Sequence, residues 1–150
     1  MRVIRWSSVL LLLAFAMACS DGTGPPIGFT HAAAAFACGT ADGPAVAIYL
    51  TPDPVTSLEP NGPYVRIYID RAVEEVGGNV WPLDDRSPVG VWLHTSAGTA
   101  EMATSGYVII NSVSADKTVD GTVNVDFPNG PHVHGDFNAP WLSRTGYSCI

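Results

Sequence analysis

Short strand-like runs recur along the chain beyond residue 44, and in some of them apolar and polar residues alternate. The clearest case is the run 64–71, in which Val65, Ile67 and Ile69 point to one side of an extended strand. Seven short strand-like runs are separated by turn-forming Gly, Pro, Asn and Ser residues: 45–50, 64–71, 89–95, 100–104, 107–113, 118–127 and 133–141. The pattern predicts an all-β fold, an antiparallel β-sandwich or small barrel of about seven strands.

Few segments favour a helix. Residues 32–37 are rich in alanine but too short to form a stable helix alone, and residues 72–76 have the length of about one turn. We therefore expect the core of the protein to lie between sheets.

The last two runs form a hairpin whose register is limited by parity. A two-residue turn would place each apolar side chain opposite a polar one, whereas a three-residue loop keeps the apolar faces together. The expected pairs are Phe127 with Val133, Val125 with Gly135, Val123 with Phe137, and Val119 with Trp141. Phe137 and Trp141 should then be buried, with glycines on the same face leaving room for the rings.

The opposite face of this hairpin carries metal-ligating residue types. In the expected register Asp126 faces His134 and Asn124 faces Asp136, with His132 at the loop end. Two histidines two residues apart project to one side of a strand, and with Asp126 and Asp136 they could bind Zn²⁺. The alternative is a solvated strand face with surface Asp–His pairs.

A second candidate site is the polar side of the run 64–71. Tyr64, Arg66, Tyr68 and Asp70 share this side. Two tyrosines on one face can form a flat platform for a sugar or peptide, with the arginine and aspartate as hydrogen-bonding partners. The alternative is that the aromatic residues simply favour strands and cover a neighbour.

Charge and missing motifs narrow the function. The chain contains seven Lys and Arg residues and 14 Asp and Glu residues, which gives a net charge of −7. This charge disfavours nucleic acids and anionic membrane surfaces as partners. The sequence contains no Gly-x-Ser-x-Gly, phosphate-binding glycine loop or His-Glu-x-x-His. A binding or structural role is therefore favoured over catalysis. The second interpretation is a metal-binding domain or metal-dependent enzyme that uses the His132 and His134 cluster.

The first 24 residues resemble the signal of a bacterial lipoprotein. An apolar run at 9–17, too short to span a bilayer, ends in small residues directly before Cys19. The resemblance implies that residues 1–18 are a signal peptide, that Cys19 is acylated, and that residues 19–30 are the anchor and a flexible tether. The protein would then face the periplasm or the cell surface, held to the membrane by lipid alone. Ordinary cleavage before Cys19 is the alternative.

The cysteine count bears on the same question. If Cys19 carries lipid, Cys38 and Cys149 remain as an even pair in an oxidising compartment, which predicts a disulfide between them. Closing so long a loop contributes about 4–5 kcal/mol in the chain-entropy description. The alternative is two unpaired cysteines near the ends of the domain.

From about residue 36 the chain also resembles uncharacterised secreted bacterial domains. These pair a Gly-Thr-x-x-x-x-Phe strand with a Gly-x-Phe-x-Ala strand and close with a cysteine, which here are Gly121-Thr122, Phe127, Gly135 to Ala139, and Cys149. The resemblance implies export and one β-sandwich domain over residues 31–150, and it assigns no activity or site residues. An envelope protein or a carbohydrate is the expected partner.

Lipidation can be tested by phase partitioning. If Cys19 is acylated, the Cys19→Ser variant should move from the detergent phase to the aqueous phase, because it loses its acyl chains. Unchanged partitioning would contradict lipidation and favour ordinary cleavage.

Overall fold

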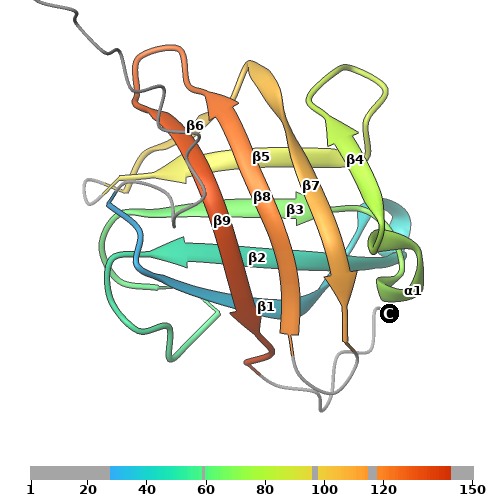
Figure 1. The fold of residues 1–150 in the computed structure, drawn as a ribbon. Coiled ribbons are helices and arrows are strands. Elements are labelled where there is room, and N and C mark those ends of the chain that lie inside the picture. Colours follow the sequence, from blue (N-terminus) through green and yellow to red (C-terminus); the bar gives the residue numbers. More distant parts are fainter. Residues whose placement is uncertain (1–27, 59, 96–97, 115–117, 143–150) are drawn as a thin grey trace, which may run out of the picture.

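The computed structural model describes residues 28–58, 60–95, 98–114 and 118–142, in two antiparallel sheets packed face to face (Figure 1). One sheet has the order β1-β2-β3-β5-β6, with β1 (His31–Cys38), β2 (Pro44–Thr51), β3 (Tyr64–Ile69), β5 (Val89–His94) and β6 (Ala100–Met102). The other has the order β4-β7-β8-β9, with β4 (Asn79–Pro82), β7 (Ser105–Val113), β8 (Thr118–Asp126) and β9 (His132–Pro140). The expected all-β sandwich is confirmed.

All seven expected runs form strands, and two further strands were not predicted. The alanine-rich β1 pairs with β2 along its whole length, from His31 opposite Thr51 to Cys38 opposite Pro44. Pairing across the sheet therefore overrides the helix preference of alanine. The short β4 is added at the edge beside β7. The sequence did not indicate either strand, because β1 consists largely of alanine and β4 has only four residues.

Within the described residues, helical structure is limited to a 3₁₀ turn (Thr40–Asp42) and the one-turn helix α1 (Val73–Val76), which lies within the segment expected to form one turn. Among the described residues no helix has the length and apolar character needed to cross a membrane.

The core between the sheets is built by alternation along the strands. Val65, Ile67 and Ile69 of β3 are fully buried, and Val119, Val123 and Val125 of β8 face them from the other sheet. Burying one such side chain contributes about 1.5–3 kcal/mol to stability.

The fold begins earlier than the sequence indicated. Phe29 is only 8% exposed and belongs to the core, so the tether expected over residues 19–30 ends before Phe29. The expected signal peptide, Cys19 and the rest of the tether lie outside the described residues.

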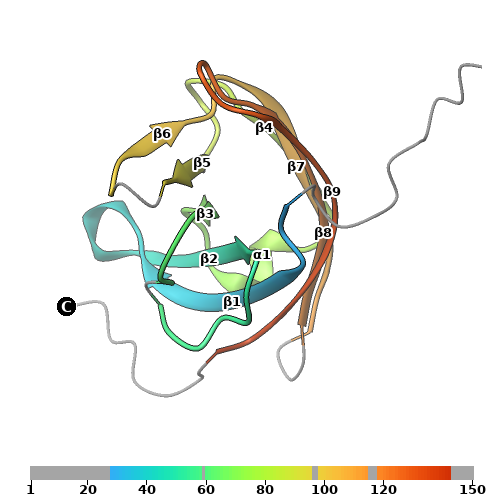
Figure 2. The ribbon, with the colours of Figure 1, turned by 90° about the vertical axis from the view of Figure 1, so that its left-hand side faces the viewer.

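One side of the sandwich is closed by contacts between β1 and the end of β9 (Figure 2). Ala34 forms a parallel bridge with Trp141, and the Leu142 N–H donates to the Ala34 carbonyl at 2.8 Å. The rings of Phe36 and Trp141 stack at 4.6 Å. Trp141, which we expected to be buried, is partly exposed at the border of the core.

The β8–β9 hairpin confirms the parity argument but not the loop length. Val125 pairs with Val133 and Gly121 with Phe137, so the apolar side chains share the core face. The expectation of a three-residue loop was wrong, because residues 127–131 form a five-residue connection. The shorter loop would place Pro128, which lacks an N–H, in the closing pair of the ladder.

Gly121 has the role expected for a glycine beneath a ring. A Cβ atom at this position would lie 2.6 Å from Cζ of Phe137. The glycine therefore lets the Phe137 ring lie flat against β8, and Phe137 is only 7% exposed.

Because the two faces of the hairpin differ in burial, two nearby substitutions should lower the free energy of unfolding by different amounts. Phe137→Ala should lower the free energy of unfolding by about 3–5 kcal/mol, because it leaves a cavity in the core. His134→Ala, on the opposite face, should change it by no more than about 0.5 kcal/mol. Equal losses in chemical denaturation would contradict this arrangement.

Candidate aromatic pocket

The outward face of the five-stranded sheet is covered over only part of its width. Val55 and Leu58, from the connection between β2 and β3, pack against a small cluster of Ala35, Ala47 and Tyr49 on β1 and β2. Tyr49 is consequently only 6% exposed. The same face of β3 and β5 lies beyond this cover.

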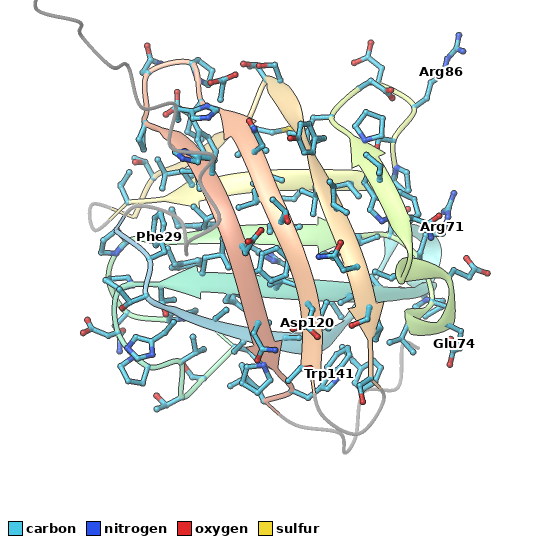
Figure 3. All side chains as sticks on the ribbon, viewed as in Figure 1. Phe29, Arg71, Glu74, Arg86, Asp120 and Trp141 are labelled. Carbon is cyan, nitrogen blue, oxygen red and sulfur yellow. The ribbon has the colours of Figure 1, made fainter. Side chains whose placement is uncertain are left out.

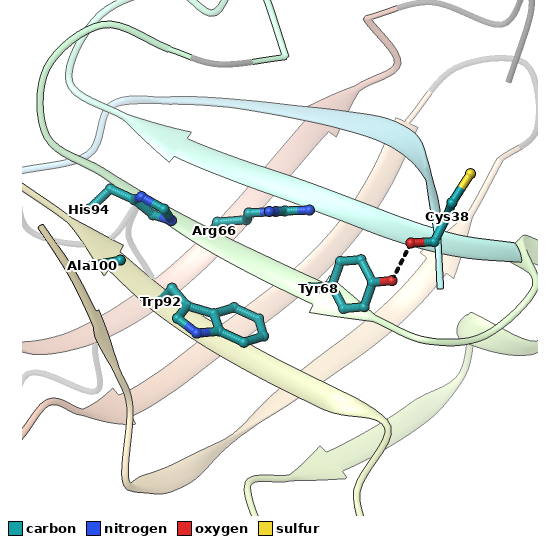
Figure 4. A pocket seen from close by; sticks show the side chains of 6 residues that line it. All are labelled: Cys38, Arg66, Tyr68, Trp92, His94 and Ala100. Carbon is teal, nitrogen blue, oxygen red and sulfur yellow. Dashed lines mark hydrogen bonds between the residues drawn. The ribbon is translucent and has the colours of Figure 1, made fainter. Parts of the chain in front are cut away.

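An open pocket of about 430 Å³ lies on this uncovered part of the sheet (Figure 4). It is lined by Cys38, Arg66, Tyr68, Trp92, His94 and Ala100. Register places these side chains together, since Arg66 pairs with Trp92 on the neighbouring strand. Alternate residues of both strands project outward, so Tyr68 and His94 point to the same side.

Ring contacts fix the positions of the side chains in the pocket. The guanidinium carbon of Arg66 lies 5.2 Å from the centroid of the Tyr68 ring, a cation–π contact. Tyr68 meets the edge of Trp92 with the centroids 6.3 Å apart, and His94 stacks on Tyr64 at 4.3 Å. The pocket is therefore preformed by its own residues.

Gly90 determines how Trp92 lies. A Cβ atom at position 90 would be 2.1 Å from Cη2 of Trp92, so the indole ring lies over β5 where only a glycine leaves space. A glycine inside a strand commonly marks such a close approach. This was the sequence signal that could have placed Trp92 on the surface.

Two titratable groups in the pocket are shifted by burial. The hydroxyl of Tyr68 donates to the Cys38 carbonyl at 2.6 Å. Burial raises the pKa of Tyr68, the charge of Asp70 raises it further, and Arg66 opposes both. Burial lowers the pKa of His94, and the nearby Arg66 lowers it further. At neutral pH the imidazole of His94 is therefore uncharged.

The structure brings together three of the four residues of the expected platform. Tyr64, Arg66 and Tyr68 share the outward face of β3, as the alternation predicted. Asp70 lies beyond the end of β3 and accepts hydrogen bonds from the backbone N–H of Thr40, at 3.3 Å, and from its hydroxyl. It therefore holds the turn between β1 and β2 and is absent from the pocket lining.

Trp92 and His94 complete the pocket and were not part of the expected platform. Trp92 lies on the outward face of β5, opposite Arg66 of β3. The missing information was the pairing of β3 with β5, which no local pattern specifies.

The hairpin cluster expected to bind metal is only partly assembled. His132 Nδ1 donates to Asp126 at 2.7 Å, so His132 takes the partner expected for His134. His134 faces Asn124, and its ring lies 5.2 Å from that of His132. Asp136 accepts a hydrogen bond from Thr122 at 2.6 Å. The longer loop causes this change of partners.

The electrostatics of the hairpin follow from these bonds. The hydrogen bond from His132 lowers the pKa of Asp126, and a second one from the Ser105 hydroxyl, at 3.0 Å, acts in the same direction. In the described part of the chain, no group of three or more His, Cys, Asp and Glu side chains is placed to hold a metal ion. Zinc binding by His132, His134, Asp126 and Asp136 stays a prediction.

The predicted disulfide also stays a prediction. Cys38 ends β1, whereas Cys149 lies outside the described residues.

Comparison with known proteins gives no match to a family, to a curated protein or to a solved structure. The function is therefore argued from the site alone.

The shifted pKa of His94 predicts a pH dependence of stability. Because the native pKa lies below the ordinary value of 6.5, the unfolded state takes up the proton first as the pH falls. Stability should therefore fall as the pH drops below about 7. His94→Gln removes this contribution. The free energy of unfolding of this variant, relative to that of the wild type, should therefore rise as the pH is lowered from 7.5 to 5.

His31→Gln is the matched control, because His31 is exposed at the start of β1. Urea unfolding at several pH values measures both variants. A His94→Gln profile parallel to that of the wild type would contradict the shift.

Proposed function

We propose that the protein is an exported, lipid-anchored domain of the bacterial envelope that binds a ligand on the open face of β3 and β5. The observation that carries this proposal is the preformed pocket of about 430 Å³ on an otherwise covered sheet face. Concave sites of this size, lined by aromatic side chains with a few polar groups, are typical of ligand binding.

The fixed positions of the side chains in the pocket support a role in ligand binding. Arg66, Tyr68 and Trp92 are held in contact with one another before any ligand arrives. Side chains that are already fixed lose little conformational entropy when a ligand binds. A ligand should therefore bind more tightly to this pocket than to one whose side chains must first become ordered.

The outward face of the four-stranded sheet offers less to a ligand. Its polar side chains bond to one another across the strands, as Thr122 does with Asp136 and Ser105 with Asp126. A ligand there would have to replace hydrogen bonds that are already made. This contrast favours the face of β3 and β5.

Export and anchoring rest on the sequence. The lipoprotein-like signal and the cysteine preceding a polar tether support an envelope location. The net charge of −7 is consistent with membrane contact through lipid and not through a basic surface.

The proposal can be tested by NMR with the mature protein and a screen of envelope carbohydrates and short peptides. A ligand should shift the signals of Arg66, Trp92 and His94. Gly90→Ala, in which the indole ring must move, should weaken binding at least about tenfold, since stacking on an aromatic ring is lost. Trp92→Ala provides a second variant, which removes the indole ring without placing a Cβ atom beneath it.

Tyr107→Ala is the control, because Tyr107 is an exposed aromatic residue on the four-stranded sheet. It should leave the affinity unchanged. Ligand shifts that map to the four-stranded sheet, or unchanged affinity in both pocket variants, would contradict the proposal.

A further inference from the structure

The guanidinium of Arg66 lacks a counter-charge in the described part of the chain. The ion pairs found there join Arg71 to Glu75 and His132 to Asp126. The Nε atom of Arg66 is buried and donates to no acceptor among the described residues. The guanidinium group contacts the face of the Tyr68 ring. A donor without an acceptor is costly, so the guanidinium group, which lines the pocket, has hydrogen-bonding capacity left for an external acceptor.

The carboxylates of Asp70 and Glu101 hydrogen-bond to other groups, and Glu101 lies opposite the inward-facing Leu93, on the other face of the sheet from Arg66. Asp70, on the strand end beyond Arg66, accepts hydrogen bonds from Thr40. Glu101 of β6 accepts from the backbone and side-chain N–H groups of Asn129, at 2.8 and 3.0 Å. The chain has 14 acidic and seven basic residues, yet neither of these two carboxylates forms an ion pair with Arg66.

The groups around Arg66 are rings without charge. Trp92 and Tyr68 present aromatic surface, and the lowered pKa of His94 leaves its imidazole neutral at pH 7. One permanent cation among rings is complementary to a ligand with one anionic group beside an apolar ring face.

The backbone of β3 and β5, the central strands of the pocket, is already paired, and the open edge of the sheet on this side is β6. β3 is hydrogen-bonded to β2 on one side and to β5 on the other. Peptides that bind by strand addition, or through a terminal carboxylate in a backbone nest, need unpaired backbone groups. Recognition over β3 and β5 therefore uses side chains, which suits a ligand that carries its own hydroxyl groups on a ring.

We propose, building on the proposed function, that the pocket binds a short saccharide bearing a single carboxylate. Arg66 binds the carboxylate through its planar pair of donors, while Trp92 and Tyr68 contact the sugar ring. A single charge is favoured because a protein of net charge −7 repels polyanions.

The test compares matched acidic and neutral sugars: methyl β-glucuronide with methyl β-glucoside, and methyl β-galacturonide with methyl β-galactoside. NMR titration of the mature protein should show at least one acid binding about tenfold tighter than its neutral partner, the effect of one charge-assisted hydrogen bond. The preference should shrink at high salt, because the pocket is open to solvent.

Two arginine variants separate the role of Arg66 from that of net charge. Arg66→Gln should abolish the preference for the acid, with the neutral sugar binding as before. Arg86→Gln makes the same charge change in an exposed loop away from the pocket, and it should keep the preference (Figure 3).

The outcomes distinguish this inference from the proposed function. Equal binding of acid and neutral sugar on the β3–β5 face, or a preference that survives Arg66→Gln, overturns the carboxylate assignment and leaves the proposed function standing. Failure of all four sugars to bind, or Arg66-dependent binding of N-acetyl-Ala-Ala in their place, overturns the saccharide assignment. The proposed function fails only if the wider screen maps no ligand to this face.

Discussion

Both the core and the pocket depend on the central position of β3, which is hydrogen-bonded to β2 and to β5. These two ladders fix which residues of β3 face inward. A shift of one residue would exchange the two faces and bring Arg66 into the core in place of Ile67. The burial of the inward side chains therefore stabilises the orientation of the outward ones, and the stability of the core holds the pocket residues in place.

Side-chain size accounts for where the cover on the outer sheet face ends. On β1 and β2 the outward positions include Ala35 and Ala47, whose short side chains leave space for Val55 and Leu58. On β3 and β5 the outward positions carry Tyr68 and Trp92, which occupy that space themselves. The connection between β2 and β3 buries one half of the face, and the aromatic half forms the wall of the pocket.

Sequence patterning predicted features that depend on one strand or one hairpin. Alternation placed Val65, Ile67 and Ile69 in the core, and parity placed Phe137 there without the correct loop length. The alanine-rich β1 was missed because its strand character comes from pairing with β2.

The candidate site was predictable in the same limited way. Tyr64, Arg66 and Tyr68 were found because one strand carries them all. Trp92 and His94 belong to a neighbour that only the sheet order supplies. Asp70 was misassigned because its partner, Thr40, is 30 residues away in the chain.

The two candidate sites differ in whether their polar groups already form hydrogen bonds within the protein. On the hairpin each carboxylate is already in use: Asp126 accepts from Ser105 and His132, and Asp136 accepts from Thr122. A metal ion would have to compete with these bonds before it gained any ligand. Arg66 in the pocket has no acceptor for its Nε among the described residues, so an anion there would break no bond of this group; on the hairpin only the Nδ1 of His134 is likewise without a partner. Because a metal site at the hairpin would need its carboxylates as well as its imidazoles, these bonds favour the pocket over the histidine cluster as the proposed binding site.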